Sequence, residues 1–124
     1  MTNKFAILIS DDDKESADLL ALVLADYFPD ATIRVVYSGE AAVEAAHIVC
    51  PDVAILDLEM PGIGGEAAAR LMRGSVSANP DSLIAVSGNV TRFESLRAAG
   101  PFDHLLTKPL DVQEVVGLLT TLSL

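Results

Sequence analysis

Five short apolar runs, each about as long as a β-strand, recur along this chain, and segments with helical periodicity lie between them. The runs are rich in Ile, Val and Leu and read FAILIS (5–10), TIRVVY (32–37), DVAILD (52–57), SLIAVS (82–87) and HLLTK (104–108). Apolar residues repeat on one helical face over 17–27 and 112–122, and further helices are expected over 39–48, 65–73 and 91–100. Strict alternation of strands and helices predicts a doubly wound α/β fold, with a five-stranded parallel sheet, five helices on its two faces and right-handed crossovers.

Polar residues and glycines mark where the helices begin and end. Capping-box spacing, in which a polar residue precedes a glutamate by three positions, occurs at Asp12–Glu15, Thr91–Glu94 and Asp111–Glu114. Gly74 and Gly100 stand where glycines commonly end helices.

The length and charge of the chain narrow the classes of function. A chain of 124 residues is long enough for one domain with a real core, so we expect a single domain over 1–124. The net charge of −10 disfavours direct contact with nucleic acid or with anionic lipid. No apolar run approaches the length of a membrane span, and a single cysteine, Cys50, fits a reducing compartment. These features predict a cytoplasmic protein.

Chemically active side chains follow four of the five expected strands. In a parallel sheet the carboxyl ends of the strands form one edge, where ligands bind at the point at which strand order reverses. The residues expected at this edge are Asp11, Asp12 and Asp13 after the first strand, Asp57 at the end of the third, Ser87 and Gly88 at the fourth, and Lys108 and Pro109 at the fifth.

This set of residues suits metal-assisted phosphoryl chemistry. Clustered carboxylates bind hard cations such as Mg²⁺, or the similar Mn²⁺. Asp57 could act as a nucleophile toward phosphorus. Lys108 and the Ser87 hydroxyl would contact phosphoryl oxygens, and Gly88 would leave the backbone open to an anion.

Four motifs in this order, DDD (11–13), LDLEMPG (56–62), SG (87–88) and KP (108–109), resemble those of bacterial two-component response-regulator receiver domains. The resemblance covers essentially the whole chain. It implies a flavodoxin-like fold with strand order 2-1-3-4-5. It also implies that a histidine kinase, or a histidine phosphotransfer protein, donates a phosphoryl group that the domain transfers to its own aspartate.

The resemblance also implies roles for single residues. Asp57 would be the phosphoacceptor, and Asp11 and Asp12 would bind the metal together with Asp57 and the backbone carbonyl of Glu59. Ser87 would be the switch hydroxyl and Lys108 the phosphate-contacting lysine. The Lys108–Pro109 peptide bond is expected to be cis. A homodimer would use the face of the fourth helix, fifth strand and fifth helix.

Three positions depart from the commonest family pattern. Ser87 is a mild case, because threonine or serine is usual there. Leu105 stands where many members carry the Tyr or Phe that rotates when the switch hydroxyl moves, so we expect the readout to come from residues 88–93 and the fourth helix. Glu59 occupies a variable position near the path of attacking water, and it leaves the dephosphorylation rate unassigned.

Other interpretations of the same residues stay open at this point. Asp12 or Asp13 could cap the next helix, and Lys108 could be a solvated surface lysine. His47 and His104 lack partners at metal-binding spacing, and MPGIGG reads as a loop with turn glycines. Two other functions compete: an aspartate-nucleophile phosphatase resembling haloacid-dehalogenase hydrolases, which would want Asp-x-Asp on the first strand, and a receiver-like adaptor that is never phosphorylated.

Overall fold

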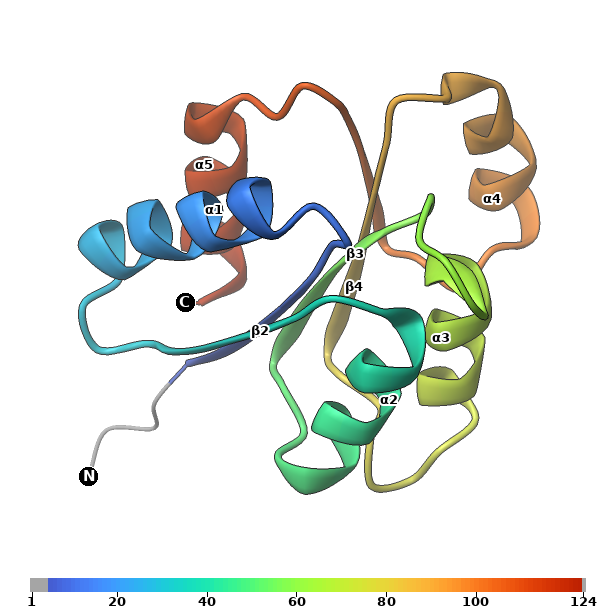
Figure 1. The fold of residues 1–124 in the computed structure, drawn as a ribbon, viewed down its shortest axis with the longest axis horizontal. Coiled ribbons are helices and arrows are strands. Elements are labelled where there is room, and N and C mark those ends of the chain that lie inside the picture. The colour runs from blue at the N-terminus through green and yellow to red at the C-terminus, as the bar shows by residue number, and fades with distance from the viewer. Residues whose placement is uncertain (1–4, 124) are drawn as a thin grey trace.

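A computed structural model describes residues 5–123, which form three layers with a β-sheet between two layers of helices (Figure 1). Residues 1–4 and 124, at the ends of the expected domain, lie outside the described part. In chain order the elements are β1 (Ala6–Ser10), α1 (Lys14–Tyr27), β2 (Thr32–Val36), α2 (Gly39–Ile48), β3 (Val53–Asp57), α3 (Gly64–Arg73), β4 (Ser82–Ser87), the 3₁₀ turn η1 (Val90–Arg92), α4 (Phe93–Ala99), β5 (His104–Thr107) and α5 (Val112–Leu122).

The sheet has the predicted topology. Its five strands are all parallel and run in the order β2-β1-β3-β4-β5, so the strand order reverses between β1 and β3. Every residue of β3 and β4 is buried, as expected for central parallel strands that carry helices on both faces. The predicted fold class is therefore confirmed, with one additional 3₁₀ turn before α4.

Helices α1 and α5 cover one face of the sheet with large aliphatic side chains (Figure 1). The alternate residues of the strands that point to this face are mostly Ile and Val, and the helices contribute Leu and Val. The buried members of this cluster are Ile7, Ile9, Ala17, Leu20, Leu24, Val53, Ile55, Ile84, Val86, Leu106, Val115 and Leu119. Burial of this much branched aliphatic surface is the main hydrophobic contribution on this side.

Helices α2, α3 and α4 cover the opposite face, where alanine predominates. The cluster beneath α2 and α3 holds Leu8, Ala42, Ala45, Ala46, Ala54, Leu56, Ala68, Ala69, Met72, Ala78 and Leu83. Because a methyl group takes little room, α2 and α3 pack closely against the sheet and each other. Phe102 packs against this cluster and also against the smaller one beneath α4, which joins the two.

The helix ends decide one cap that the sequence left open between Asp12 and Asp13, and they correct another. Asp13, and not Asp12, caps α1: its side chain accepts a hydrogen bond from the Ser16 N–H. The Thr91 prediction is wrong, because Asn89 caps η1 and α4 begins without a side-chain cap. Asp111 caps α5, and Gly74 and Gly100 stand at the ends of α3 and α4, as predicted. Within residues 5–123, no helix is both long and apolar enough to cross a lipid bilayer.

Candidate functional site

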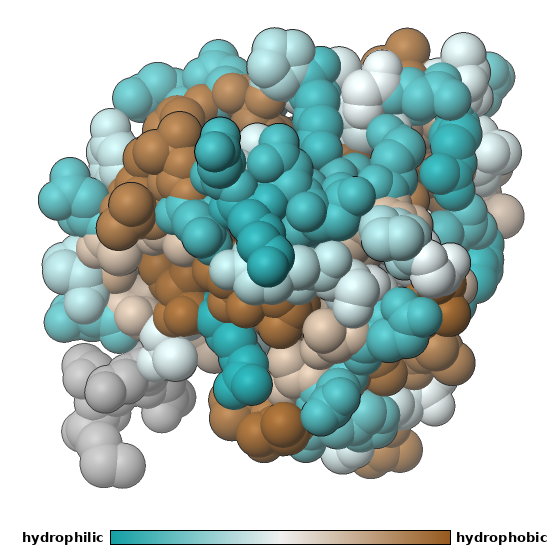
Figure 2. Space-filling model, viewed as in Figure 1, coloured by the Kyte–Doolittle hydropathy of each residue, from teal (hydrophilic) through white to brown (hydrophobic). Residues whose placement is uncertain are grey.

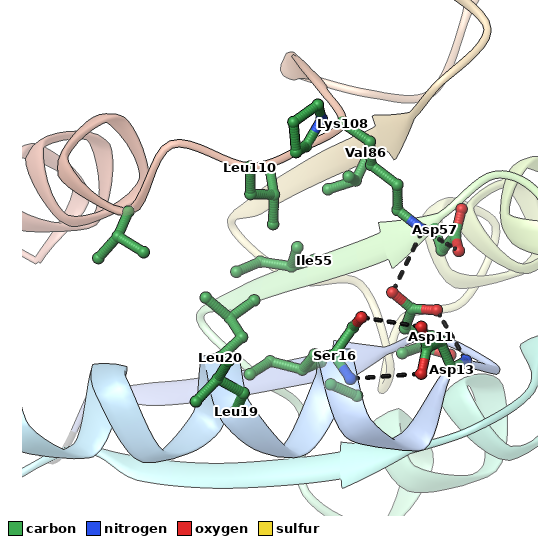
Figure 3. A pocket seen from close by; sticks show the side chains of 15 residues that line it. Asp11, Asp13, Ser16, Leu19, Leu20, Ile55, Asp57, Val86, Lys108 and Leu110 are labelled. Carbon is green, nitrogen blue, oxygen red and sulfur yellow. Dashed lines mark hydrogen bonds and ion pairs between the residues drawn. The ribbon is translucent and has the colours of Figure 1, made fainter.

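The carboxyl ends of β1, β3, β4 and β5 bring the predicted side chains to one edge of the sheet. In the view of Figure 2 hydrophilic residues gather in the middle of the surface, with hydrophobic surface beside them over α1. Helix α1 carries two exposed leucines, Leu19 and Leu22. A cleft of about 610 Å³ opens between α1 and the segment after β5, with Asp11, Asp57 and Lys108 at its polar end and Leu20 and Leu110 among its apolar lining (Figure 3).

Asp57 ends β3 and is almost fully buried, with 3% of its surface exposed. Its Oδ2 accepts a hydrogen bond of 2.6 Å from the Lys108 Nζ (Figure 3). Its Oδ1 accepts one of 3.0 Å from the Glu59 N–H. The first turn of α3 approaches closely here, since a Cβ on Gly65 would lie 2.2 Å from the Asp57 carbonyl oxygen. Only glycine permits this contact between helix and strand end.

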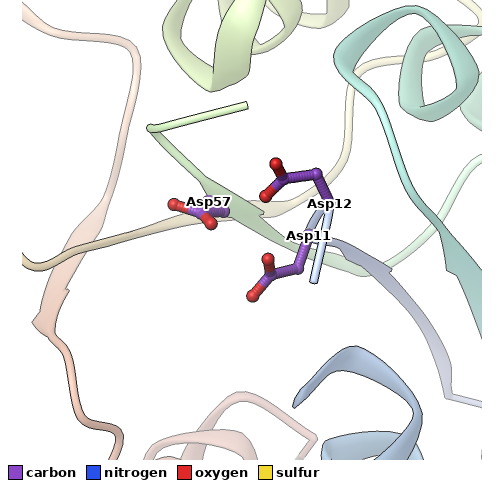
Figure 4. Close-up of side chains that lie close together, drawn as sticks. All are labelled: Asp11, Asp12 and Asp57. Carbon is purple, nitrogen blue, oxygen red and sulfur yellow. The ribbon is translucent and has the colours of Figure 1, made fainter. Parts of the chain in front are cut away.

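Asp11 and Asp12 lie beside Asp57, whereas Asp13 does not belong to the cluster (Figure 4). Carboxylate oxygens of Asp11, Asp12 and Asp57 all lie within 4.8 Å of one another. The Asp13 side chain instead accepts hydrogen bonds from the backbone N–H and the hydroxyl of Ser16. The DDD motif thus divides between an acidic cluster and a helix cap.

The charges within this cluster are unbalanced. Burial raises the pKa of the Asp11 carboxyl above its usual value; the Asp13 N–H opposes that rise, and the adjacent Asp57 carboxylate adds to it. Burial acts to lower the pKa of Lys108, but the hydrogen bond and charge of Asp57, together with Asp11 at 3.4 Å, raise it overall. Lys108 contacts two of the three clustered carboxylates, and oxygen donors at this spacing suit a hard divalent cation.

Lys108 is held by the join between β5 and the following loop. Its backbone N–H donates to the Ser87 carbonyl at 2.9 Å, which ties the ends of β4 and β5 together. The Lys108–Pro109 peptide bond is cis. The side chain reaches Asp57 and Asp11 across the mouth of the cleft and keeps 34% of its surface exposed.

The sequence does not predict the contacts that the Glu59 side chain makes with Ser87 and Gly88. Its carboxylate accepts hydrogen bonds from the Ser87 hydroxyl at 2.7 and 2.8 Å, and from the Gly88 N–H at 3.3 Å. From the sequence, the Glu59 backbone carbonyl is expected to bind the metal and the residue is expected near the path of attacking water, with no partner named for its carboxylate. An acidic residue two positions after a candidate phosphoacceptor was the available signal, but its partner on a different strand was not visible from sequence.

The remaining candidate residues fall outside the charged cluster. Leu105 is partly buried and packs against the cluster of Leu58, Ala85, Phe93 and Leu96. His47 is exposed and lies 3.2 Å from the Ser77 hydroxyl, and Cys50 is also exposed. Of the three glycines in MPGIGG, Gly62 lies in a turn as predicted, whereas Gly64 and Gly65 begin α3; Gly62 and Gly64 have φ angles of 76° and 77°.

Comparison with known proteins gives the family. The family model described as "Response regulator receiver domain" matches residues 7–120. The chain belongs to the response-regulator receiver family. This receiver domain is 31% identical over 112 residues to "Stress response regulator protein 1" of Debaryomyces hansenii, covering 89% of this chain and 46% of the relative. It is 30% identical over 117 residues to "DNA-binding response regulator MtrA" of Mycolicibacterium smegmatis, covering 94% of this chain and 49% of that protein.

Solved structures agree on the fold of the receiver domain. The signal receiver domain of a DNA-binding response regulator from Colwellia psychrerythraea has a TM-score of 0.82 at 31% identity, covering 96% of this chain and 98% of that one. The receiver domain of a sensor histidine kinase from Pseudomonas aeruginosa PAO1, solved with a magnesium ion coordinated in its active site cleft, has a TM-score of 0.84 at 22% identity, covering 98% of each chain. The chain spans about half the length of the curated relatives described above.

Proposed function

We propose that this receiver domain accepts a phosphoryl group on Asp57 and transmits that event by a change of conformation. The observation that carries the proposal is the position of Asp57: a buried carboxylate at a strand end, hydrogen-bonded to Lys108 and flanked by the Asp11 and Asp12 carboxylates. A surface aspartate in a turn would need neither the burial nor the surrounding charges.

A divalent cation belongs to this proposal because the donor set fits one. Asp11, Asp12 and Asp57 would hold Mg²⁺ or Mn²⁺, and the Glu59 carbonyl is the further ligand expected from the family pattern. The cation would supply positive charge that lets an anionic phosphodonor approach three carboxylates. The magnesium ion in the Pseudomonas aeruginosa receiver domain supports the same assignment.

The residues of the site then divide the work of phosphoryl transfer. A carboxylate oxygen of Asp57 forms a bond to phosphorus while the bond from phosphorus to the donor breaks, and the electron pair stays with the donor. Lys108 releases part of its contact with Asp57 and donates to a phosphoryl oxygen, and Ser87 and the Gly88 N–H donate to another. Fixed donors of this kind stabilise the charge that develops on the phosphoryl oxygens.

The donor that this chemistry fits is a phosphohistidine on a histidine kinase or on a histidine phosphotransfer protein. Breaking a phosphorus–nitrogen bond leaves an imidazole that the partner can protonate, so the receiver domain needs no acid of its own for the leaving group. The identity of the partner and the target of the signal are properties of the whole protein. A homodimer through the α4, β5 and α5 surface stays a prediction, which sedimentation with and without a phosphoryl mimic would test.

The test is intact mass spectrometry after exposure to acetyl phosphate with Mg²⁺. The wild-type chain should gain the mass of one phosphoryl group, and Asp57→Asn should gain none. Asp81→Asn serves as the matched control, because Asp81 precedes β4 at the opposite edge of the sheet and should leave the adduct unchanged. An equal mass gain in Asp57→Asn, mapped to another residue, would refute the assignment.

The same experiment separates the competing functions. An aspartate-nucleophile phosphatase would consume the phosphodonor continuously without a lasting adduct, and an adaptor would show neither adduct nor consumption. The phosphoacceptor is favoured because Lys108 contacts Asp57 directly and the Ser87 hydroxyl is bonded to Glu59, two residues after Asp57.

A further inference from the structure

Two of the donors assigned to the phosphoryl group are already occupied by a carboxylate of this chain. Glu59 follows Asp57 by two residues, and its side chain accepts from both the Ser87 hydroxyl and the Gly88 N–H. The Ser87 residue is fully buried, whereas 47% of the Glu59 side chain is exposed. The exposed Glu59 carboxylate, which has room to move, thus accepts from a buried hydroxyl that is held in place.

The Ser87 hydroxyl cannot serve both partners at once. A hydroxyl has one hydrogen to donate and accepts through its lone pairs. The Ser87 Oγ accepts from the Asn89 N–H at 2.9 Å and donates to the Glu59 carboxylate, with the Asn89 carbonyl at 3.4 Å as a longer alternative. A phosphoryl oxygen can therefore bind the hydroxyl hydrogen only after Glu59 gives it up.

Glu59 also has a second cation that can retain it after release. The Arg92 guanidinium lies 3.8 Å from the Glu59 carboxylate and 3.0 Å from the carboxylate of Glu66 in α3. Arg92 belongs to η1, which directly follows the Ser87–Asn89 segment. Movement of Glu59 away from Ser87 is thus linked through an ion pair to the turn that precedes α4.

We infer that Glu59 is a positioning residue that mimics the phosphoryl group in the resting state, holding Ser87 and Gly88 until phosphorylation of Asp57 displaces it. The inference rests on the proposed function. In the resting state the Glu59 carboxylate satisfies the buried hydroxyl, which would otherwise lose a hydrogen bond. On phosphorylation the phosphoryl oxygens take over these donors, and Glu59 turns toward Arg92 and solvent.

The contacts of Glu59 reduce the free energy that a phosphoryl group can contribute to the change of conformation. Binding of a phosphoryl group gains contacts with Ser87 and Gly88 but must first break those with Glu59, so its differential interaction with the two states is reduced. Removing the internal carboxylate should favour the active state. The gain should depend on Ser87, because competition for one hydroxyl disappears when the hydroxyl is absent.

The experiment is an NMR titration with beryllium trifluoride, a phosphoryl mimic, at saturating Mg²⁺. It compares the wild-type chain, Glu59→Ala, Ser87→Ala and the double variant. Glu59→Ala should bind the mimic about tenfold more tightly than wild type, in line with the loss of a charge-assisted hydrogen bond. In the Ser87→Ala background the same substitution should gain about twofold or less. Before any mimic is added, the Gly88 amide signal should already shift in Glu59→Ala.

Glu94→Gln is the matched control, because Glu94 is an exposed glutamate of α4 and, among the described residues, makes no hydrogen bond or ion pair with Ser87, Gly88 or Arg92. It should bind the mimic as wild type does. An equal gain from Glu59→Ala in both serine backgrounds would show simple charge repulsion and overturn the inference, and so would no gain at all. Failure of the wild-type chain to bind the mimic would overturn the proposed function and this inference together.

Discussion

The two halves of the site differ in how their polar groups are satisfied. In the acidic half, Asp11, Asp12 and Asp57 bring oxygens within 4.8 Å of one another, and Lys108 is the cation that contacts two of them. In the donor half, the Ser87 hydroxyl and the Gly88 N–H are both bonded to Glu59. The acidic half thus has more negative than positive charge, whereas the Ser87 hydroxyl and the Gly88 N–H each already have an acceptor.

This difference assigns a different kind of event to each half. Burial and, after it, the neighbouring Asp57 carboxylate raise the pKa of Asp11, and a cation added to the acidic half would offset the repulsion between these carboxylates. A phosphoryl group can engage the donor half only by exchange with Glu59. Metal binding should therefore respond mainly to charge, and switching should respond mainly to the competition for donors.

The largest effect is expected from a substitution in the acidic half. Asp12→Asn removes one of the clustered charges, so Mg²⁺ affinity should fall by about tenfold to a hundredfold, because ligand charge strongly sets affinity for hard cations. Phosphorylation by acetyl phosphate should fall in parallel at limiting Mg²⁺. Calorimetric titration with Mg²⁺ and the rate of mass gain measure the two quantities.

The adjacent residue supplies the control for that experiment. Asp13→Asn makes the same chemical change one position later, but Asp13 caps α1 and stands outside the cluster. It should leave Mg²⁺ affinity within about twofold of wild type, since only a distant charge is lost in high dielectric. Equal losses in both variants would mean that the site senses only the total charge of the DDD motif.

A smaller effect on metal affinity is expected from Lys108→Ala, and it should be opposite in sign to the effect on the rate of phosphorylation. Loss of a cation that contacts Asp57 and Asp11 removes repulsion toward Mg²⁺, so the affinity for the metal should rise by roughly threefold to tenfold. The rate of phosphorylation should fall by about tenfold or more, because a donor to the phosphoryl oxygens is gone.

Lys14→Ala is the control for the loss of charge alone. Lys14 begins α1 near the same edge and lies over the Tyr37 ring, 5.2 Å from its centroid. Both the metal affinity and the rate should stay within about twofold of wild type. A fall in metal affinity in Lys108→Ala would contradict the division of the site into two halves.

The sequence predicted the fold and the acidic half well, for a physical reason. Strand and helix periodicity, repeated in strict alternation, left one fold class, and parallel strands necessarily bring their carboxyl ends to one edge. Asp11, Asp12, Asp57 and Lys108 lie together because each follows directly from the end of a strand. Their backbone positions alone made the contact foreseeable.

The sequence did not predict contacts that depend on side-chain direction. Asp12 and Asp13 are chemically identical neighbours, and only the geometry of the turn decided that Asp13 would cap α1. Thr91 does not cap α4, because that helix is preceded by a 3₁₀ turn, which Asn89 caps, and begins without a side-chain cap of its own. The bond from Ser87 to Glu59 joins the end of β4 to the loop after β3, and no sequence periodicity records which rotamer the glutamate adopts.

The smallest expected effect lies at Leu105, which belongs to neither half of the site. Its side chain packs among Leu58, Ala85 and Phe93 and carries no polar group that could exchange a buried hydrogen bond for an exposed one. Displacement of Glu59 instead acts on Arg92 and therefore on residues 88–93. With the phosphoryl mimic bound, amide exchange and chemical shifts should change most in that segment and least at Leu105, with residues 28–31 at the opposite edge of the sheet as the reference. Large changes centred on Leu105 together with an unchanged 88–93 segment would show that the signal leaves through β5, as it would with an aromatic residue at that position.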